Sequence, residues 1–137
     1  MNQPAAQPPP NSSATVLVIE HDEATLVTYQ RILELGGFSV RTAISAPDAL
    51  RDVVAHPPDA IVVDFRMPVM DGLAFLRALR ARLSHAATPV AIVTGDYQLD
   101  ERLITQLQDL GAVIRFKPLW VDELTALANQ LLGRPTR

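Results

Sequence analysis

The sequence contains no cysteine, so disulfide bonds and thiolate metal ligands are excluded. It has no apolar run near the roughly 20 residues that a bilayer-spanning helix needs. Its N-terminus also lacks the basic start and apolar stretch of a secretory signal. Neither a GxxxxGK(S/T) loop nor a GxGxxG turn occurs, which argues against a bound nucleotide. From these absences we expect a soluble, cytoplasmic protein that does not contact a membrane.

An excess of basic charge is also missing. The formal net charge is -3 and the estimated isoelectric point is about 5.5. This balance gives no broad electrostatic surface for nucleic acid or for an anionic membrane. The apolar fraction of 48% over 137 residues is ample for a single packed core, so global disorder is excluded.

The chain divides into a short tail and one domain. Residues 1–14 are rich in Pro, Gln, Asn, Ser and Ala and contain no apolar pattern. We interpret them as a flexible or partly polyproline tail, with a Pro-rich ligand for a partner domain as the alternative. Residues 15–133 are predicted to form the domain, and residues 134–137 a short second tail.

Short apolar runs and helical patterns alternate along this domain. Most of the runs are apolar at successive positions, which is typical of parallel strands buried on both faces. The predicted strands are Val16–Ile19, Phe38–Ala43, Ala60–Val63, Val90–Val93 and Ala112–Ile114. The helical patterns are Leu26–Leu33, Ser45–Ala55, Leu73–Leu83, Leu103–Leu110 and Leu124–Leu131. Five strand–helix repeats of this kind predict an α/β fold, a parallel sheet with helices on both faces.

Polar residues end four of the five predicted strands: Glu20, Asp64, Thr94 and Lys117. In an open α/β sheet, ligands bind beyond the carboxyl ends of the strands, so these side chains are expected to lie together. Two carboxylates can hold a hard cation, while a hydroxyl and an ammonium group bind phosphate oxygens. The pattern therefore points to a metal ion with a phosphate group.

These residues and their surroundings resemble the receiver domains of two-component response regulators. The most specific segment runs from Ala60 to Gly72 (AIVVDFRMPVMDG) and resembles the phosphoacceptor segment of that family, in which Asp64 ends the third strand. Two further pieces are Val93-Thr94-Gly95 and Phe116-Lys117-Pro118. The resemblance covers about residues 15 to 132. It implies a (βα)5 doubly wound, flavodoxin-like sheet in the strand order 2-1-3-4-5.

The resemblance also implies a function. Asp64 would accept a phosphoryl group from a histidine kinase or a histidine phosphotransfer protein, as a signalling step rather than as enzymatic turnover of a metabolite. Lys117 would pair with Asp64 at rest and with the phosphoryl oxygens afterwards, and Thr94 would bind one of those oxygens. Mg²⁺ would be held by the acids after the first strand, by Asp64, and by the backbone carbonyl of Arg66.

The sequence departs from the family pattern after its first strand. Receivers carry two successive acids there, and the second is the direct Mg²⁺ ligand; this chain has Glu20 followed by His21. Three consequences remain open. Asp22 or Glu20 supplies the missing oxygen ligand, or His21 shifts the preference towards Mn²⁺ or another transition ion, or metal binding and phosphorylation are weakened.

A second departure lies at Ile114, where the family often carries an aromatic residue that changes rotamer on activation. Together with His21, it motivates an alternative function, that of a pseudo-receiver acting as a phosphorylation-independent interaction module. An aspartate-based phosphohydrolase is disfavoured because Arg66 stands where such enzymes carry a second aspartate. The start at Met1 and the end soon after the last predicted helix favour a stand-alone regulator, with an unknown downstream protein target.

Overall fold

The computed structural model describes residues 14–82, 86–95 and 99–135. Residues 1–13 of the predicted N-terminal tail and residues 136 and 137 lie outside this part of the chain. Ala14, assigned above to the tail, is instead buried, and its carbonyl oxygen accepts a hydrogen bond from the Ser39 amide. The packed domain therefore includes Ala14, one residue before its predicted start.

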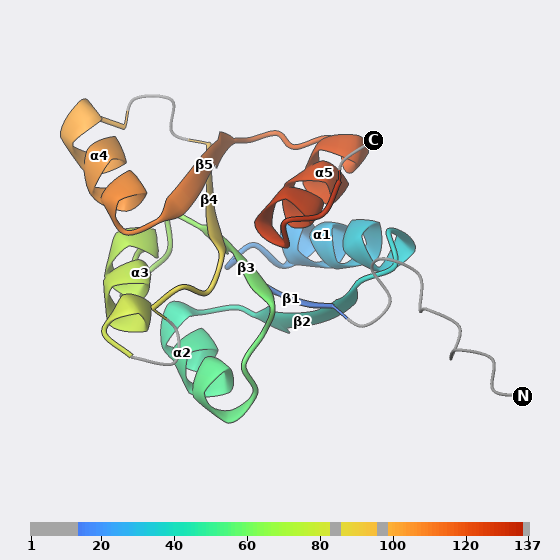
Figure 1. Cartoon of the computed structure of the whole chain (residues 1–137), viewed down its shortest axis with the longest axis horizontal. Helices are drawn as coiled ribbons and strands as arrows, with labels where there is room; N and C mark the ends of the chain where they lie inside the picture. Colours follow the sequence, from blue (N-terminus) through green and yellow to red (C-terminus); the bar gives the residue numbers. More distant parts are fainter. Residues whose placement is uncertain (1–13, 83–85, 96–98, 136–137) are drawn as a thin grey trace, which may run out of the picture.

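Five parallel strands form one sheet in the order β2-β1-β3-β4-β5, which confirms the predicted fold and topology (Figure 1). The strands are β1 (Thr15–Ile19), β2 (Ser39–Ala43), β3 (Ala60–Asp64), β4 (Val90–Thr94) and β5 (Ala112–Phe116). β5 continues two residues beyond its predicted end. Phe38, predicted in β2, precedes that strand instead, and its amide donates to Leu33 at the end of the first helix.

Five helices connect and follow the strands. They are α1 (Glu23–Leu35), α2 (Ala46–Ala55), α3 (Gly72–Arg80), α4 (Glu101–Asp109) and α5 (Val121–Leu131). α3 ends at Arg80, and Leu83 of the predicted third pattern lies outside the described residues. Across the described ranges, no helix is both long enough and apolar enough to span a membrane.

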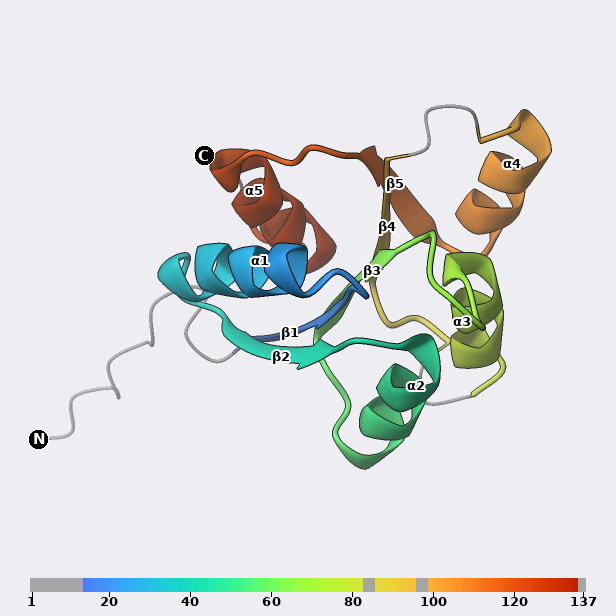
Figure 2. The ribbon, with the colours of Figure 1, turned by 180° about the vertical axis from the view of Figure 1, so that it is seen from behind.

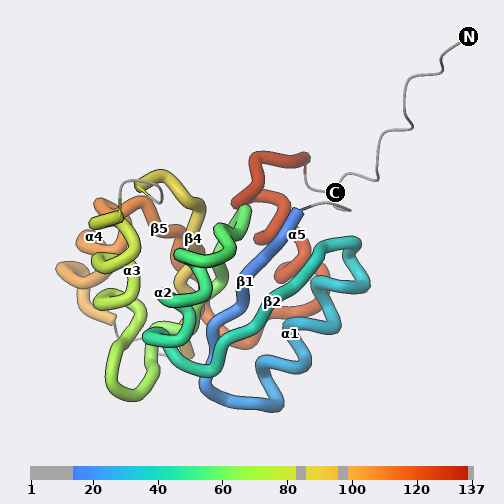
Figure 3. The backbone as a smooth tube through the Cα atoms, turned by 90° about the horizontal axis from the view of Figure 1, so that it is seen from below, coloured from blue at the N-terminus to red at the C-terminus, as the bar shows by residue number. Residues whose placement is uncertain are grey.

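The sheet is apolar on both faces because successive side chains of a strand point to opposite sides. In β1, Leu17 and Ile19 belong to the core under α2, α3 and α4, while Val16 and Val18 belong to the core under α1 and α5. Figures 2 and 3 show these two helix groups on opposite sides of the strands. This two-sided burial explains why the strand sequences do not alternate between apolar and polar residues.

The starts of the helices are set by polar caps. Asp22, Ser45, Asp71 and Asp100 each accept a hydrogen bond from the backbone amide three residues later, at the starts of α1 to α4. Ser45, where the second helical pattern was predicted to begin, is thus the cap of α2, and the helix itself starts at Ala46. Each of these helices follows the carboxyl end of a strand, so the caps also fix where the strand-end loops turn back.

Candidate functional site

The carboxyl ends of β1, β3, β4 and β5 meet at one edge of the sheet, as the strand order requires. Glu20 follows β1, Asp64 ends β3, Thr94 ends β4 and Lys117 follows β5. Glu20, Asp64 and Thr94 are the three buried polar residues among those described. Buried carboxylates next to one another need a compensating cation, since burial alone disfavours their charged forms.

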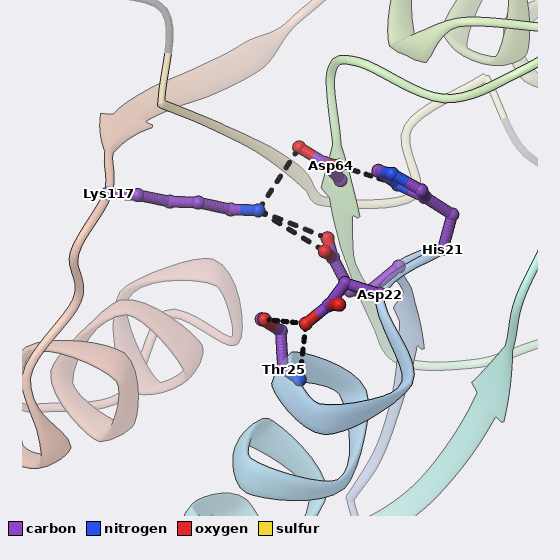
Figure 4. A network of polar contacts seen from close by, with 6 residues as sticks. His21, Asp22, Thr25, Asp64 and Lys117 are labelled. Carbon is purple, nitrogen blue, oxygen red and sulfur yellow. Dashed lines mark hydrogen bonds and ion pairs between the residues drawn. The ribbon is translucent and has the colours of Figure 1, made fainter.

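Lys117 supplies that compensation. Its Nζ lies 3.3 Å from both carboxylate oxygens of Glu20 and 3.4 Å from Oδ1 of Asp64 (Figure 4). The Lys117 backbone amide also donates to the Thr94 carbonyl oxygen at 2.8 Å, which fixes the start of the loop after β5 beside β4. The peptide bond between Lys117 and Pro118 is cis. One ammonium group is thus shared between the two buried carboxylates.

His21 approaches Asp64 from the other side. Its Nδ1 lies 3.3 Å from Oδ2 of Asp64, so each carboxylate oxygen of Asp64 faces a nitrogen group. The His21 side chain is 45% exposed, whereas that of Asp64 is 4% exposed. Within the described part of the chain, Glu20, His21 and Asp64 form a group whose candidate metal-ligating atoms all lie within 4.8 Å of one another.

Asp22 is not part of this group. Its Oδ2 accepts from the Thr25 amide at 2.9 Å and from Thr25 Oγ1 at 2.6 Å, and Figure 4 shows the carboxylate turned towards Thr25. These hydrogen bonds lower the pKa of Asp22. The sequence analysis missed this role, although an aspartate just before the apolar helical pattern of α1 is an ordinary N-cap signal.

The loop between β3 and α3 holds Asp64 at the sheet edge. The Gly72 amide donates to the Phe65 carbonyl oxygen at 2.8 Å, and a Cβ atom on Gly72 would lie 3.0 Å from Phe65 Cα. Glycine avoids this contact, which is tighter than nine in ten Cβ contacts and would require the Phe65 backbone to shift. Val69, at the outer turn of the loop, has a φ of 72° and is fully exposed.

Arg66, a predicted metal ligand, and Gly95 lie at the exposed rim of the site. Arg66 is exposed, with its guanidinium carbon 5.4 Å from the centre of the Phe65 ring. The role of its backbone carbonyl as a metal ligand still rests on the resemblance. Beside Thr94, a Cβ atom on Gly95 would meet no atom of the described residues within 4 Å. Residues 96–98, which follow, lie outside the described chain.

The electrostatic field of the site is negative. Burial raises the pKa of Glu20, the neighbouring Asp64 carboxylate raises it further, and Lys117 partly offsets both effects. Burial, together with the charges of Glu20 and Asp64, raises the pKa of Tyr29 to about 12. A second positive charge is therefore favoured in this pocket. The carboxylates of Glu20 and Asp64 fit a divalent cation such as Mg²⁺, but the His21 nitrogen is not a donor that Mg²⁺ prefers.

Comparisons with known proteins agree with this geometry. The model of the response regulator receiver domain matches residues 16–129. The transcriptional regulatory protein PrrA of Mycobacterium leprae is 38% identical over 123 residues, which cover 90% of this chain and 52% of that protein. The response regulator MprA of Mycolicibacterium vanbaalenii is 34% identical over 122 residues, covering 88% and 51%. The chain thus spans about half the length of these relatives.

Solved structures give the same assignment. The chemotaxis response regulator CheY4 of Vibrio cholerae superposes with a TM-score of 0.80 at 25% identity, over 88% of this chain and 99% of that one. A response regulator receiver domain protein from Clostridium thermocellum gives a TM-score of 0.78 at 27% identity, over 88% and 94%. The fold, the sheet-edge carboxylates and these matches lead to one conclusion: the chain belongs to the response regulator receiver domain family.

Proposed function

We propose that Asp64 accepts a phosphoryl group from a phosphohistidine of a histidine kinase or a histidine phosphotransfer protein. The observation that carries the proposal is the placement of the Asp64 carboxylate, which ends β3 at the sheet edge between the Lys117 ammonium group and the His21 ring. Receiver domains are phosphorylated by histidine kinases, and membership of that family is the general support for the proposal.

The reaction transfers phosphorus from nitrogen to oxygen. A carboxylate oxygen of Asp64 attacks the phosphorus, the P–N bond breaks, and its electron pair stays on the donor imidazole, which takes up a proton from water. Lys117, 3.4 Å from Oδ1, then binds the phosphoryl oxygens together with the Thr94 hydroxyl. Later hydrolysis of the acyl phosphate by water returns the free carboxylate and inorganic phosphate.

A divalent cation assists this transfer by neutralising charge on the phosphoryl oxygens. Glu20, Asp64 and the backbone carbonyl of Arg66 are the oxygen ligands we assign to Mg²⁺. Mn²⁺ accepts imidazole more readily than Mg²⁺ does, so His21 would be an additional ligand of Mn²⁺. Asp22 would join only by giving up its hydrogen bonds to Thr25, so it is the weakest of the proposed ligands.

The new charge would be transmitted to a surface formed by α4, β5 and α5. Thr94 ends β4 directly beside β5, opposite Phe116, and is fully buried. Movement of its side chain towards the phosphoryl group therefore displaces packed neighbours. Ile114 in β5 is half-buried against the core under α2, α3 and α4. An aliphatic side chain cannot make the rotamer change of an aromatic ring, so the conformational change at this position is limited to shifts in packing.

The partners follow from the same proposal. We place the protein in the cytoplasm, where it would meet its kinase. Our expectation that no nucleic acid is bound concerns the receiver domain, whose sequence carries no excess of basic charge. The relative PrrA is named a transcriptional regulatory protein and the match covers about half of its length, so DNA binding in a longer regulator is compatible with this domain.

A second candidate function is a phosphorylation-independent interaction module. The contact between His21 and Asp64 favours this function, because it engages the carboxylate that is proposed as the nucleophile. The aliphatic residue at Ile114 favours it as well. In this case D64N would leave binding to the physiological partner unchanged.

The test is an incubation of the full chain with phosphoramidate or acetyl phosphate, with Mg²⁺, with Mn²⁺ and with a chelator, followed by intact-mass analysis. We expect one phosphoryl adduct that D64N abolishes. The variant D71N is the matched control, because Asp71 caps α3 and asparagine preserves the cap. An adduct that survives in D64N, or no adduct with any cation, contradicts the proposal and leaves the interaction module.

A further inference from the structure

We propose that His21 makes this pocket a mixed nitrogen–oxygen site, which binds late first-row divalent cations such as Co²⁺ and Zn²⁺ directly through Nδ1. The inference rests on the proposed function in placing the cation at the phosphoacceptor pocket. It goes beyond that function because it assigns a ligand and a class of ion that the family's two successive acids do not provide.

The geometry around Asp64 carries the proposal. His21 Nδ1 lies 3.3 Å from Asp64 Oδ2, and Figure 4 shows the ring turned towards that carboxylate. Neighbouring ligands of an ion bound at about 2.1 Å are roughly 3 Å apart. The two atoms therefore already stand near the separation that a shared ion requires. Glu20 completes the group, since one candidate ligand atom from each of Glu20, His21 and Asp64 lies within 4.8 Å of the others.

Within the described ranges, no other carboxylate joins Glu20 and Asp64 in place of the missing acid. Asp22 is the nearest in sequence, but its Oδ2 holds both the amide and the hydroxyl of Thr25 at the start of α1. Turning Asp22 into the pocket would leave the first turn of α1 without its cap. His21 is half-exposed and has no such role, so its ring is free to adjust to an ion.

Charge and donor chemistry then decide which ion is favoured. The pocket holds two carboxylates, and both contact the Lys117 ammonium group. A third negative charge, which would attract a hard ion, is missing because the second acid is replaced by an imidazole. Mg²⁺ depends on oxygen ligands and charge, whereas Co²⁺ and Zn²⁺ bind imidazole well. The substitution therefore weakens binding of Mg²⁺ and preserves or strengthens binding of the late ions.

The direct test is nitrogen NMR of the full chain, labelled with ¹⁵N in its histidine rings and titrated with diamagnetic Zn²⁺. The variant H56Q/H85Q removes the two other histidines of the sequence, so the remaining ring signals belong to His21. We expect the Nδ1 signal of His21 to move to the position of a metal-bound nitrogen at saturating Zn²⁺. An Nδ1 signal that stays unchanged while Zn²⁺ binds, or no binding of Zn²⁺, overturns the proposal.

The selectivity test compares wild type with H21D, which restores two successive acids, and with H21Q, which supplies no nitrogen ligand. Calorimetry with Mg²⁺ and Co²⁺ gives the ratio of the two dissociation constants for each protein. We expect H21D to reduce the preference for Co²⁺ over Mg²⁺ by about tenfold or more, and H21Q to weaken Co²⁺ binding. An unchanged ratio in H21D overturns the proposal.

These outcomes are separate from those of the phosphorylation test. If Asp64 is phosphorylated normally with Mg²⁺ but Zn²⁺ never reaches Nδ1, the proposed function stands and this inference fails. If Zn²⁺ is bound through Nδ1 but no cation supports an adduct on Asp64, the metal site stands and the phosphoacceptor function fails.

Discussion

The Lys117 ammonium group lies 3.3 Å from both carboxylate oxygens of Glu20, a residue 97 positions away in the sequence. The same group lies 3.4 Å from Asp64, so one positive charge serves two buried carboxylates. The pKa of Glu20 remains raised, because burial and the charge of Asp64 outweigh the effect of Lys117. Without a bound cation, the pocket therefore holds excess negative charge that costs folding free energy.

This excess charge makes the stability of the metal-free protein depend on pH. Because the pKa of Glu20 is raised in the folded state, its contribution to stability is fully present below the ordinary value of 4.5. The contribution is lost as the pH rises through the raised value. We expect E20Q to raise the melting temperature at pH 7 by about 4 °C, the shift that about 1 kcal/mol produces. The gain should vanish near pH 4.5.

The measurement is thermal unfolding of E20Q and wild type between pH 4.5 and 7, with a chelator present throughout. The control is E34Q, because Glu34 lies on the exposed surface of α1, and it should change the melting temperature far less. A lower melting temperature for E20Q at pH 7 would show that the ion pair with Lys117 outweighs the repulsion.

Asp22 separates the structural role of an acid near the pocket from a role as metal ligand. We expect D22A to lower the melting temperature, because α1 loses its cap at Thr25, and D22N to preserve it. D22N should also leave the dissociation constants for Mg²⁺ and Co²⁺ nearly unchanged, because the Asp22 side chain is hydrogen-bonded to Thr25 and not to a proposed metal ligand. Calorimetry checks this, and a marked loss of affinity in D22N would place Asp22 in that shell.

Much of the fold could be predicted from the sequence, because strands that are buried on both faces of the sheet have continuous apolar sequences. Strands such as β3 are apolar at every position except the functional end, and a continuous apolar run of this length is typical of a parallel strand buried on both faces. The ends of elements were harder to predict. Phe38 is as apolar as a strand residue, yet it closes the end of α1, because its amide bonds Leu33 rather than a neighbouring strand.

The site could be predicted in outline only. Glu20, Asp64, Thr94 and Lys117 follow or end strands, so topology alone places them at one edge. Their pairing depends on side-chain geometry that no local pattern encodes, which is why the sharing of Lys117 with Glu20 was not foreseen. The open alternatives at His21 had the same origin.

Val69 carries backbone strain that a substitution should release. Its φ of 72° is in the left-handed region, which β-branched residues avoid, and its side chain is 99% exposed and so gains nothing from packing. We expect V69N to stabilise the protein by about 1 kcal/mol in urea denaturation. The control V54N, at an exposed helical position in α2, should not stabilise. Equal effects of the two substitutions would argue against strain at Val69.

Arg80 joins three segments at the edge of the sheet opposite the site. From α3, its Nε donates to the Leu110 carbonyl oxygen at 2.7 Å and its Nη1 to the Thr88 carbonyl oxygen at 2.6 Å. These bonds tie the end of α4 and the approach to β4 to one side chain.

We expect R80A to lower the free energy of unfolding by about 1–3 kcal/mol, because it leaves both carbonyl groups without this donor. R80K should recover only part of the loss, since an ammonium group lacks the planar fork of donors. Urea denaturation measures both, with R77A at an exposed position of the same helix as the control. If R77A costs as much as R80A, the loss reflects the helix itself and not the bridge to Leu110 and Thr88.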